Sequence, residues 1–192
     1  MAKQAYVYSG TDWVPLASEV TNLSAYQTKA TTGLVLLNTT SFSGVSSIAF
    51  PNDSFSATYD NYKILWKGVG STTVECRFRL RVAGVDNSTA SSYNIQRFTV
   101  SDTTLLGVRS AATSGWFAVI TSTAPNTFSA DIFNPFLAVP TAFISQNFRN
   151  NANAQIEDYY SQHNQSTSYD SINIIASTGT FTGEMSLYGY NK

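Results

Sequence analysis

Few residues in this chain have the type and spacing that covalent catalysis requires. The only histidine, His163, lies in the polar stretch Gln162-His163-Asn164-Gln165, and its candidate partners nearby in the sequence are Ser161, Asp158 and Asp170. A catalytic nucleophile needs an adjacent base and a third group that orients this base, and the sequence contains no Gly-x-Ser-x-Gly elbow. We therefore interpret His163 as a solvated loop histidine, and we predict no catalytic residue.

Carboxylates could act in a pair, as in glycoside hydrolases, or bind a metal ion. The acidic residues inside predicted strands are Glu75, Asp131 and Glu184, and the sequence does not give their separation. Asp131 is the most interesting of the three, but a structural role, in which its carboxylate bonds a loop amide, explains its position as well as a catalytic role does. The cluster Asp86-Asn87-Ser88-Thr89 offers oxygen ligands but is typical of an ordinary turn. The single cysteine, Cys76, excludes a Cys-rich zinc site. We predict neither a metal nor a cofactor.

These side chains must be positioned by β-strands, because the strongest pattern in the sequence is an apolar residue at every second position. From Val74 to Val82 apolar residues alternate with Thr73, Glu75 and three arginines, which places Cys76 on the apolar face as a small core residue. The pattern predicts a hairpin over residues 62–82 and a second over 172–187. No segment of twelve residues carries a helical apolar stripe. About eleven short strands predict an all-β fold: an antiparallel, jelly-roll-like β-sandwich spanning residues 34–192.

The overall charge and hydrophobicity of the chain exclude some classes of binding partner. The 192 residues include 11 basic and 12 acidic side chains, a net charge of −1, which gives no field that attracts nucleic acid or acidic membranes. Residues 1–4 begin no apolar signal region, and no apolar run approaches the ~18 residues of a membrane span. We therefore expect a protein made in the cytosol that binds neither nucleic acid nor membranes.

The N-terminus differs from the rest of the chain. Residues 6–8 and 13–16 flank a short turn and predict a small hairpin within an extended arm, residues 1–17, while residues 18–33 form a polar linker. Two strands alone are marginal in water, so exposed rings here need a surface to pack on. A frayed terminus is the plainer interpretation. The functional one is attachment to another subunit through four anchors, Tyr6, Tyr8, Trp13 and Leu16.

Half of the six arginines form one row. Arg77, Arg79 and Arg81 point the same way from one predicted strand, about 7 Å apart. Such a row blunts edge pairing on a solvated face, but guanidinium groups also suit contacts with carboxylates of a partner. Leu65, exposed on the strand expected beside this row, favours a covered face. We therefore predict a subunit contact over Leu65 and the three arginines.

Several segments resemble known proteins. Residues 42–50 (FSGVSSIAF), 59–65 (YDNYKIL) and 78–84 (FRLRVAG) resemble a segment that recurs in minor structural proteins of tailed bacteriophages. Residues 180–190 (TFTGEMSLYGY) are similar to the closing strand of the same proteins. Residues 6–16 (YVYSGTDWVPL) resemble the N-terminal attachment segment of virion proteins from phages of cyanobacteria.

The resemblance implies a non-enzymatic structural protein of the virion, made in the host cytoplasm. It would be a capsid decoration (cement) protein or a short fibre, usually a homotrimer, with the major capsid protein or another virion protein as partner. The alternative is a tail fibre or tail tip protein that binds a receptor or host glycan through Tyr159, Tyr160, Asn164 and Tyr169. A polysaccharide-degrading enzyme would need a carboxylate pair across a groove.

Overall fold

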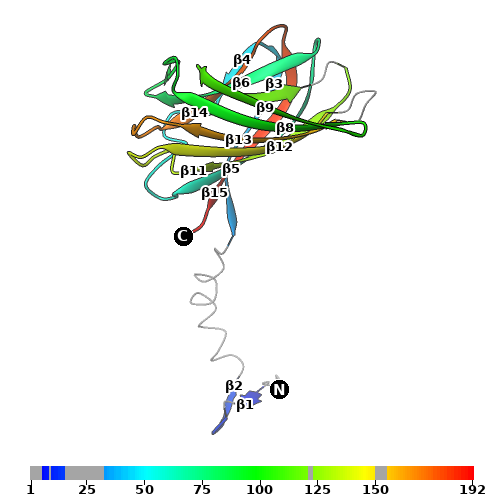
Figure 1. Ribbon diagram of the computed structural model, residues 1–192. Coiled ribbons are helices and arrows are strands. Elements are labelled where there is room, and N and C mark those ends of the chain that lie inside the picture. Colours follow the sequence, from blue (N-terminus) through cyan, green and yellow to red (C-terminus); the bar gives the residue numbers. More distant parts are fainter. Residues whose placement is uncertain (1–5, 9, 16–32, 121–122, 150–154) are drawn as a thin grey trace. The chain divides into compact units, whose positions relative to one another are not determined.

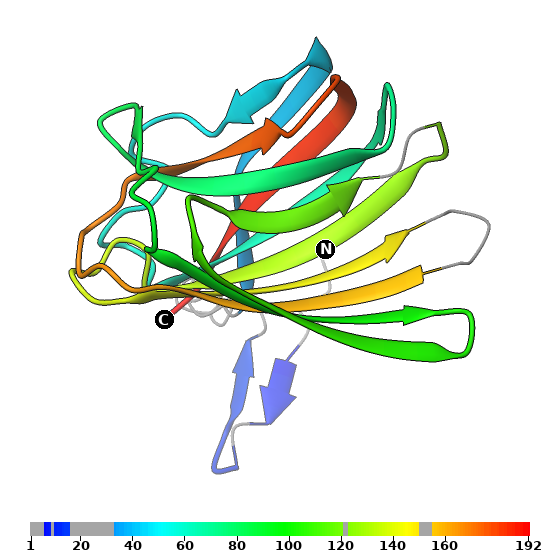
Figure 2. The same cartoon turned by 45° about the horizontal axis from the view of Figure 1, so that its top comes forward.

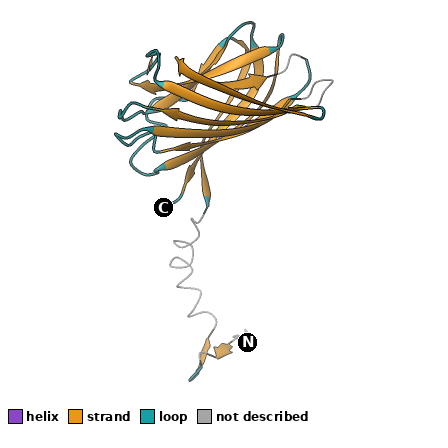
Figure 3. Ribbon diagram, in the orientation of Figure 1, coloured by secondary structure: helices purple, strands orange, loops and turns teal. Residues whose placement is uncertain are grey.

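The computed structural model describes residues 6–8, 10–15, 33–120, 123–149 and 155–192 (Figure 1). The chain divides into two compact units, one of residues 1–34 with Asn191 and one of residues 35–190 with Lys192. The described residues lie in strands, turns and loops (Figure 3). Among them there is no helix with the length and apolar character that crossing a membrane would require. The predicted all-β class is confirmed.

The first unit contains a two-stranded antiparallel sheet of β1 (Tyr6–Tyr8) and β2 (Trp13–Pro15). Tyr8 is the register partner of Trp13, and the two rings are 5.4 Å apart. The predicted small hairpin is therefore present. Leu16, the fourth predicted anchor, and residues 18–32 of the predicted linker lie outside the described residues.

The second unit is an antiparallel β-sandwich, and its larger sheet has eight strands in the order β3-β15-β5-β11-β12-β13-β8-β9. In chain order their bounds are β3 Leu34–Val45, β5 Asn61–Gly70, β8 Tyr93–Ser101, β9 Thr104–Thr113, β11 Asn126–Phe133, β12 Thr141–Arg149, β13 Gln155–His163 and β15 Phe181–Tyr190. Burial alternates along the strands, so that Phe128, Ala130 and Ile132 of β11 are buried and their neighbours face outward.

The smaller sheet covers one face of the larger one (Figures 1 and 2). Its strand order is β10-β6-β14-β4, and β7 pairs with the end of β6; the bounds are β4 Ser47–Ala49, β6 Val74–Val82, β7 Val85–Asp86, β10 Trp116–Ile120 and β14 Ser171–Ala176. Cys76 on β6 is fully buried, and this burial raises the pKa of its thiol. The predicted core role of Cys76 is confirmed.

Aromatic rings fill the space between the two sheets. The Trp66 and Phe128 rings of the larger sheet are stacked with centroids 5.4 Å apart, and Phe78 of the smaller sheet meets Phe128 edge-on at 5.4 Å. Trp116 stacks on Phe143 across the sheets at 4.7 Å. Offset and edge-to-face pairs of this kind are the favoured aromatic geometries, so the rings hold the two sheets in one arrangement.

Two glycines allow β5 and β15 to approach each other closely. Gly68 is the register partner of Gly183. A Cβ atom on Gly68 would lie 2.5 Å from the Thr182 carbonyl oxygen, and one on Gly183 would collide with the backbone of Lys67. The glycines therefore leave room that any larger residue would close.

Both predicted hairpins are wrong. β5 pairs with β15 and β11 in the larger sheet, whereas β6 pairs with β14 and β10 in the smaller sheet. The segments 71–73 and 177–180 therefore carry the chain from one sheet to the other. These connections lie side by side, because the Ser71 amide donates a hydrogen bond of 2.8 Å to the Thr180 carbonyl. A Gly- and Ser-rich connection looks the same in sequence whether it joins neighbours in one sheet or crosses between two sheets.

Candidate binding groove

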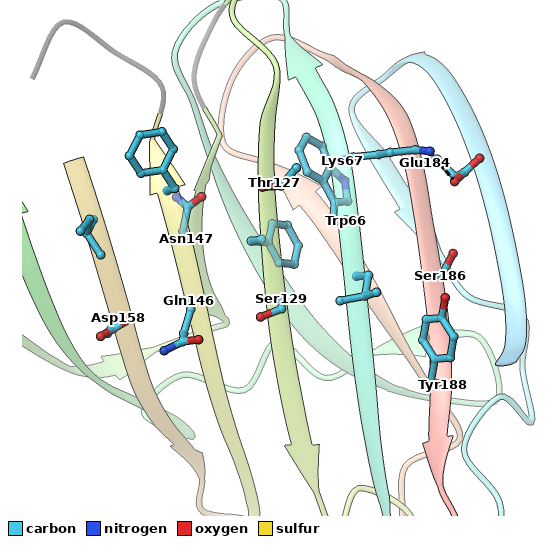
Figure 4. A pocket seen from close by; sticks show the side chains of 14 residues that line it. Trp66, Lys67, Thr127, Ser129, Gln146, Asn147, Asp158, Glu184, Ser186 and Tyr188 are labelled. Carbon is cyan, nitrogen blue, oxygen red and sulfur yellow. Dashed lines mark ion pairs between the residues drawn. The ribbon is translucent and has the colours of Figure 1, made fainter. Parts of the chain in front are cut away.

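A groove of about 750 Å³ lies on the outer face of the larger sheet, which is turned away from the smaller sheet (Figure 4). It crosses five neighbouring strands, β15, β5, β11, β12 and β13. Its outward side chains occupy positions that alternate with core residues: Leu65 and Lys67, for example, flank the buried Trp66. The alternation that builds the core therefore also builds the groove.

The strand register arranges side chains of the groove in one row. Asp158 is the partner of Gln146, and Gln146 is the partner of Ser129. Ser129 is opposite Leu65, which in turn is opposite Ser186. Four spacings between neighbouring strands make this row about 19 Å long, measured along the sheet. Figure 4 shows Asp158, Gln146 and Ser129 on successive strands.

Four polar side chains of the groove make no hydrogen bond or ion pair within the described part of the chain: Thr127, Ser129, Gln146 and Asp158. Other polar groups nearby are already paired. Lys67 Nζ lies 3.0 Å from Glu184 Oε1, and the Ser186 and Thr39 hydroxyls share a hydrogen bond of 3.0 Å. The unpaired groups are free to bond a ligand, and the unpaired carboxylate makes the groove slightly negative.

Apolar side chains form the wall of the groove over β12 and β13. Phe148 and Ile156 are register partners, and each is about half exposed. Exposed apolar residues continue from this wall onto β8 and β9; we call this area the apolar patch, and it consists of Phe98, Val100, Leu105 and Tyr160. The groove thus combines an apolar wall with a few unpaired polar groups, as ligand sites usually do.

The carboxylates of this face do not form a catalytic pair. Asp158 and Glu184 are separated by four strand spacings, about 19 Å along the sheet, whereas glycoside hydrolysis needs roughly 5–10 Å. Asp131 lies 3.1 Å from Lys63 Nζ in an ion pair. Glu75 belongs to the smaller sheet. Within the described residues, no group of three or more His, Cys, Asp or Glu could hold a metal ion.

Tyr190 joins the Lys63–Asp131 pair from the neighbouring strand β15. Its hydroxyl donates a hydrogen bond to Asp131 Oδ1, while Lys63 Nζ donates to both carboxylate oxygens. Burial, followed by the hydrogen bond to Asp131, raises the pKa of Tyr190 to about 12. Asp131 is therefore engaged by two side chains of its own sheet, and the loop-amide explanation of this residue is replaced by an ion pair.

The four residues predicted as one subunit contact lie on two sheets. Leu65 faces outward from β5 of the larger sheet, whereas Arg77, Arg79 and Arg81 belong to β6 of the smaller sheet. The outer faces of a sandwich point in opposite directions, so Leu65 cannot support a contact made by the arginines. The interpretation of Leu65 was wrong because β5 and β6 are not neighbours.

Two arginines of the row bond other residues of their own unit, on the outer side of the smaller sheet. Arg79 Nε donates a hydrogen bond of 2.8 Å to the Ser114 carbonyl, and Arg81 Nε lies 2.9 Å from Asp86 Oδ1. Arg81 also donates to the Gly84 carbonyl. These bonds link β6 to β7 and to the turns at Gly84 and Ser114, so Arg79 and Arg81 have a structural role within this chain.

The three described anchors of the N-terminal hairpin expose their rings. Tyr6 and Tyr8 are about half exposed, and Trp13 is 69% exposed. Two facing strands of three residues cannot enclose rings of this size. The hairpin therefore leaves most of its aromatic surface uncovered.

The interpretation of His163 as a solvated loop residue is wrong. His163 ends β13 and is fully buried, with ring centroids 4.4 Å from Tyr93 and 5.2 Å from Tyr169. Its Nδ1 lies 3.4 Å from the Tyr169 hydroxyl. Removal from water lowers the pKa of His163 to about 4, because burial disfavours the charged imidazolium.

The residues expected to hold a sugar do not form one site. Tyr159 and Tyr169 are buried, and the hydroxyl of Tyr169 accepts a hydrogen bond from Asn87. Asn164 donates to the Ser91 carbonyl, and only Tyr160 of the three tyrosines is exposed. The sequence did contain Gln146 and Asp158 at outward positions of predicted strands, but no local signal indicates that these strands are neighbours.

Comparisons with known proteins identify no family. No known protein family and no curated protein sequence matches this chain. A fructofuranosidase variant from Schwanniomyces occidentalis is similar in structure at 7% identity and a TM-score of 0.31, over 83% of this chain and 34% of that chain. Sucrose-6-phosphate hydrolase from Lactobacillus gasseri is similar at 11% identity and a TM-score of 0.31, over 81% and 28% of the two chains.

This chain therefore spans about a third of the length of either hydrolase. CG-16, a homodimeric agglutinin from chicken liver, is similar at 8% identity and a TM-score of 0.26, over 71% of this chain and 99% of that chain. Similarity at this level supports no conclusion about activity or ligand.

Proposed function

We propose that this chain is a non-enzymatic structural protein of a tailed-phage virion. It acts as a capsid decoration (cement) protein or a short fibre, and it is attached through its N-terminal hairpin to the major capsid protein or another virion protein. The resemblance of residues 6–16, 42–50, 59–65, 78–84 and 180–190 to phage virion proteins supports this proposal. It is also supported by the hairpin, because three exposed rings in a unit of their own suit docking on a partner.

Exposed aromatic rings are the observation that carries the proposal. Tyr and Trp side chains dominate the energy of many interfaces, since each buries a large apolar area when it enters a pocket. In a homotrimer the same weak contact would be repeated three times, which raises the avidity without any new type of contact. The apolar patch on β8, β9 and β13 provides an apolar surface for contact between copies.

Deletion of residues 1–17 tests the attachment. The truncated protein should fold as a sandwich with an unchanged unfolding midpoint but should be absent from purified particles. Its presence in particles at the level of the full chain would overturn the proposal. Light scattering of the purified full chain tests the trimer separately, and a monomer at micromolar concentration would contradict it.

A receptor-binding protein of the tail is the second candidate function. The residues first expected to hold a glycan are partly buried, but the open groove on the larger sheet offers a different surface for the same role. Binding of purified protein to host cells would favour this candidate, since a pure cement protein should bind nothing on the cell.

A further inference from the structure

We infer that the groove on the larger sheet binds a neutral oligosaccharide. This inference gives the receptor-binding candidate a site and a ligand class. It is independent of the hairpin, because every side chain used below belongs to the sandwich. Its failure would leave attachment through the hairpin untouched.

The first argument is the hydrogen-bonding capacity left open in the groove. Ser129 and Thr127 hydroxyls both donate and accept, the Gln146 amide does the same through two atoms, and the Asp158 carboxylate accepts only. None of the four is used by another described side chain. A sugar hydroxyl also donates and accepts, so a row of such groups on neighbouring strands matches a hydroxyl-rich ligand.

The second argument is the apolar surface beside these polar groups. The Phe148 ring and the Ile156 side chain stand half exposed next to the row, and Leu65 is exposed within it. Tyr188 lines the groove on β15, next to Ser186 (Figure 4). The C–H faces of sugar rings can cover such surfaces while their hydroxyls bond the polar groups, which combines burial with hydrogen bonding.

The third argument is charge. Lys67 is neutralised by Glu184, while Asp158 has no counter-ion among the described residues. An anionic ligand would meet an unpaired carboxylate and no free cation in the groove, so acidic sugars and phosphates are disfavoured. A peptide adding to a sheet would need a free strand edge, but the groove lies on a face where the backbone of all five strands is already paired. These features together favour a neutral oligosaccharide.

An array of neutral and acidic oligosaccharides, probed with the purified full chain, tests the inference. We expect binding to neutral oligosaccharides, and the best of them is then titrated by calorimetry. Asp158→Asn and Gln146→Ala should each weaken this binding at least tenfold with unchanged unfolding midpoints. The matched controls Asp102→Asn and Gln162→Ala, at exposed positions outside the groove, should bind within twofold of the parent.

Three results would overturn the inference. They are no binding to any oligosaccharide of the array, binding to acidic ones alone, and equal affinity of the groove variants and the parent. Particle incorporation of Asp158→Asn distinguishes this failure from failure of the proposed attachment. The variant should enter particles normally, because the groove and the hairpin act independently.

Discussion

Two ring pairs with the same separation lie in opposite surroundings. Tyr8 and Trp13 in the hairpin have centroids 5.4 Å apart, as do Trp66 and Phe128 in the sandwich. Trp66 and Phe128 are almost completely buried, whereas more than half of the surface of Tyr8 and Trp13 is exposed. In the sandwich the two rings lie on neighbouring strands of the larger sheet, inside the core between two sheets, whereas in the hairpin they lie on the two strands of a single small sheet.

The difference shows what each unit can do alone. In the sandwich, stacked and edge-on rings bury their full area and stabilise the fold. In the hairpin, the ring pair holds the turn but leaves most of its apolar area in water. That area contributes free energy when another surface covers it, which is the physical basis for the proposed attachment through the hairpin.

The largest change in the free energy of unfolding should come from the buried ring pair, Trp66 and Phe128. Trp66→Ala should lower the free energy of unfolding by about 3–5 kcal/mol, since it removes a large side chain from a packed core. Trp13→Ala should change it by less than about 0.5 kcal/mol, because an exposed ring contributes little to folding. Urea unfolding of both variants measures the difference. Equal losses would mean that the hairpin rings are packed as the core rings are.

A second effect concerns the buried imidazole of the sandwich. The pKa of His163 is about 4 in the folded protein and about 6.5 in the unfolded chain, so below pH 6.5 the unfolded state binds a proton that the folded state does not. The stability contribution is therefore complete above pH 6.5 and is lost as the pH falls towards 4. The total loss is roughly 3 kcal/mol.

Urea unfolding of the parent and His163→Gln at pH 7, 5.5 and 4.5 isolates this contribution, because the acidic groups are common to both. The parent should lose more stability than the variant over this range. Parallel pH dependence would contradict the burial of His163.

Sequence patterns predicted where the strands lie in the chain far better than which strands pair with each other in the sheets. The alternation of Val74–Val82 predicted β6 correctly, but the turn beside it was interpreted as a hairpin, because sheet crossovers and hairpin turns use the same residues. β9 was missed, since Leu105 and Leu106 are adjacent and Gly107 interrupts the pattern. Both leucines are exposed because β9 is an edge strand of the larger sheet.

The surroundings of His163 and the binding groove were also not predictable, because both depend on contacts between segments that are distant in the sequence. His163 has four polar neighbours in sequence, and its burial follows from long-range packing against Tyr93 and Trp116. Gln146 and Asp158 are twelve residues apart and become register partners only when β12 pairs with β13. A groove that crosses five strands depends on strand order, which no single segment encodes.

A third effect separates folding from attachment. Trp13→Ser should weaken binding to particles that lack this protein by about 2 kcal/mol or more, because it removes the most exposed of the three described anchors. Val85→Ser, at a similarly exposed apolar side chain of the sandwich, serves as the matched control and should bind normally. Sedimentation of particles with each labelled variant measures the difference. Loss of binding in both variants would point to the sandwich as the docking unit.

The smallest effect should come from the exposed ion pair of the groove. Lys67→Met should change the free energy of unfolding by less than about 1 kcal/mol, because both partners remain in contact with water. Arg81→Met should cost more, since Arg81 and Asp86 are about four-fifths buried and the carboxylate would keep the Asn173 amide but lose its cation. Thermal unfolding compares the two variants, and a larger loss for Lys67→Met would reverse the expected order.

The most direct test is electron cryomicroscopy of intact particles purified with this protein. The account predicts density for residues 6–15 buried against another virion protein, with the rings of Tyr6, Tyr8 and Trp13 in its pockets and the sandwich carried outside. Particles without this chain, or with the sandwich docked and the hairpin rings in solvent, would contradict it.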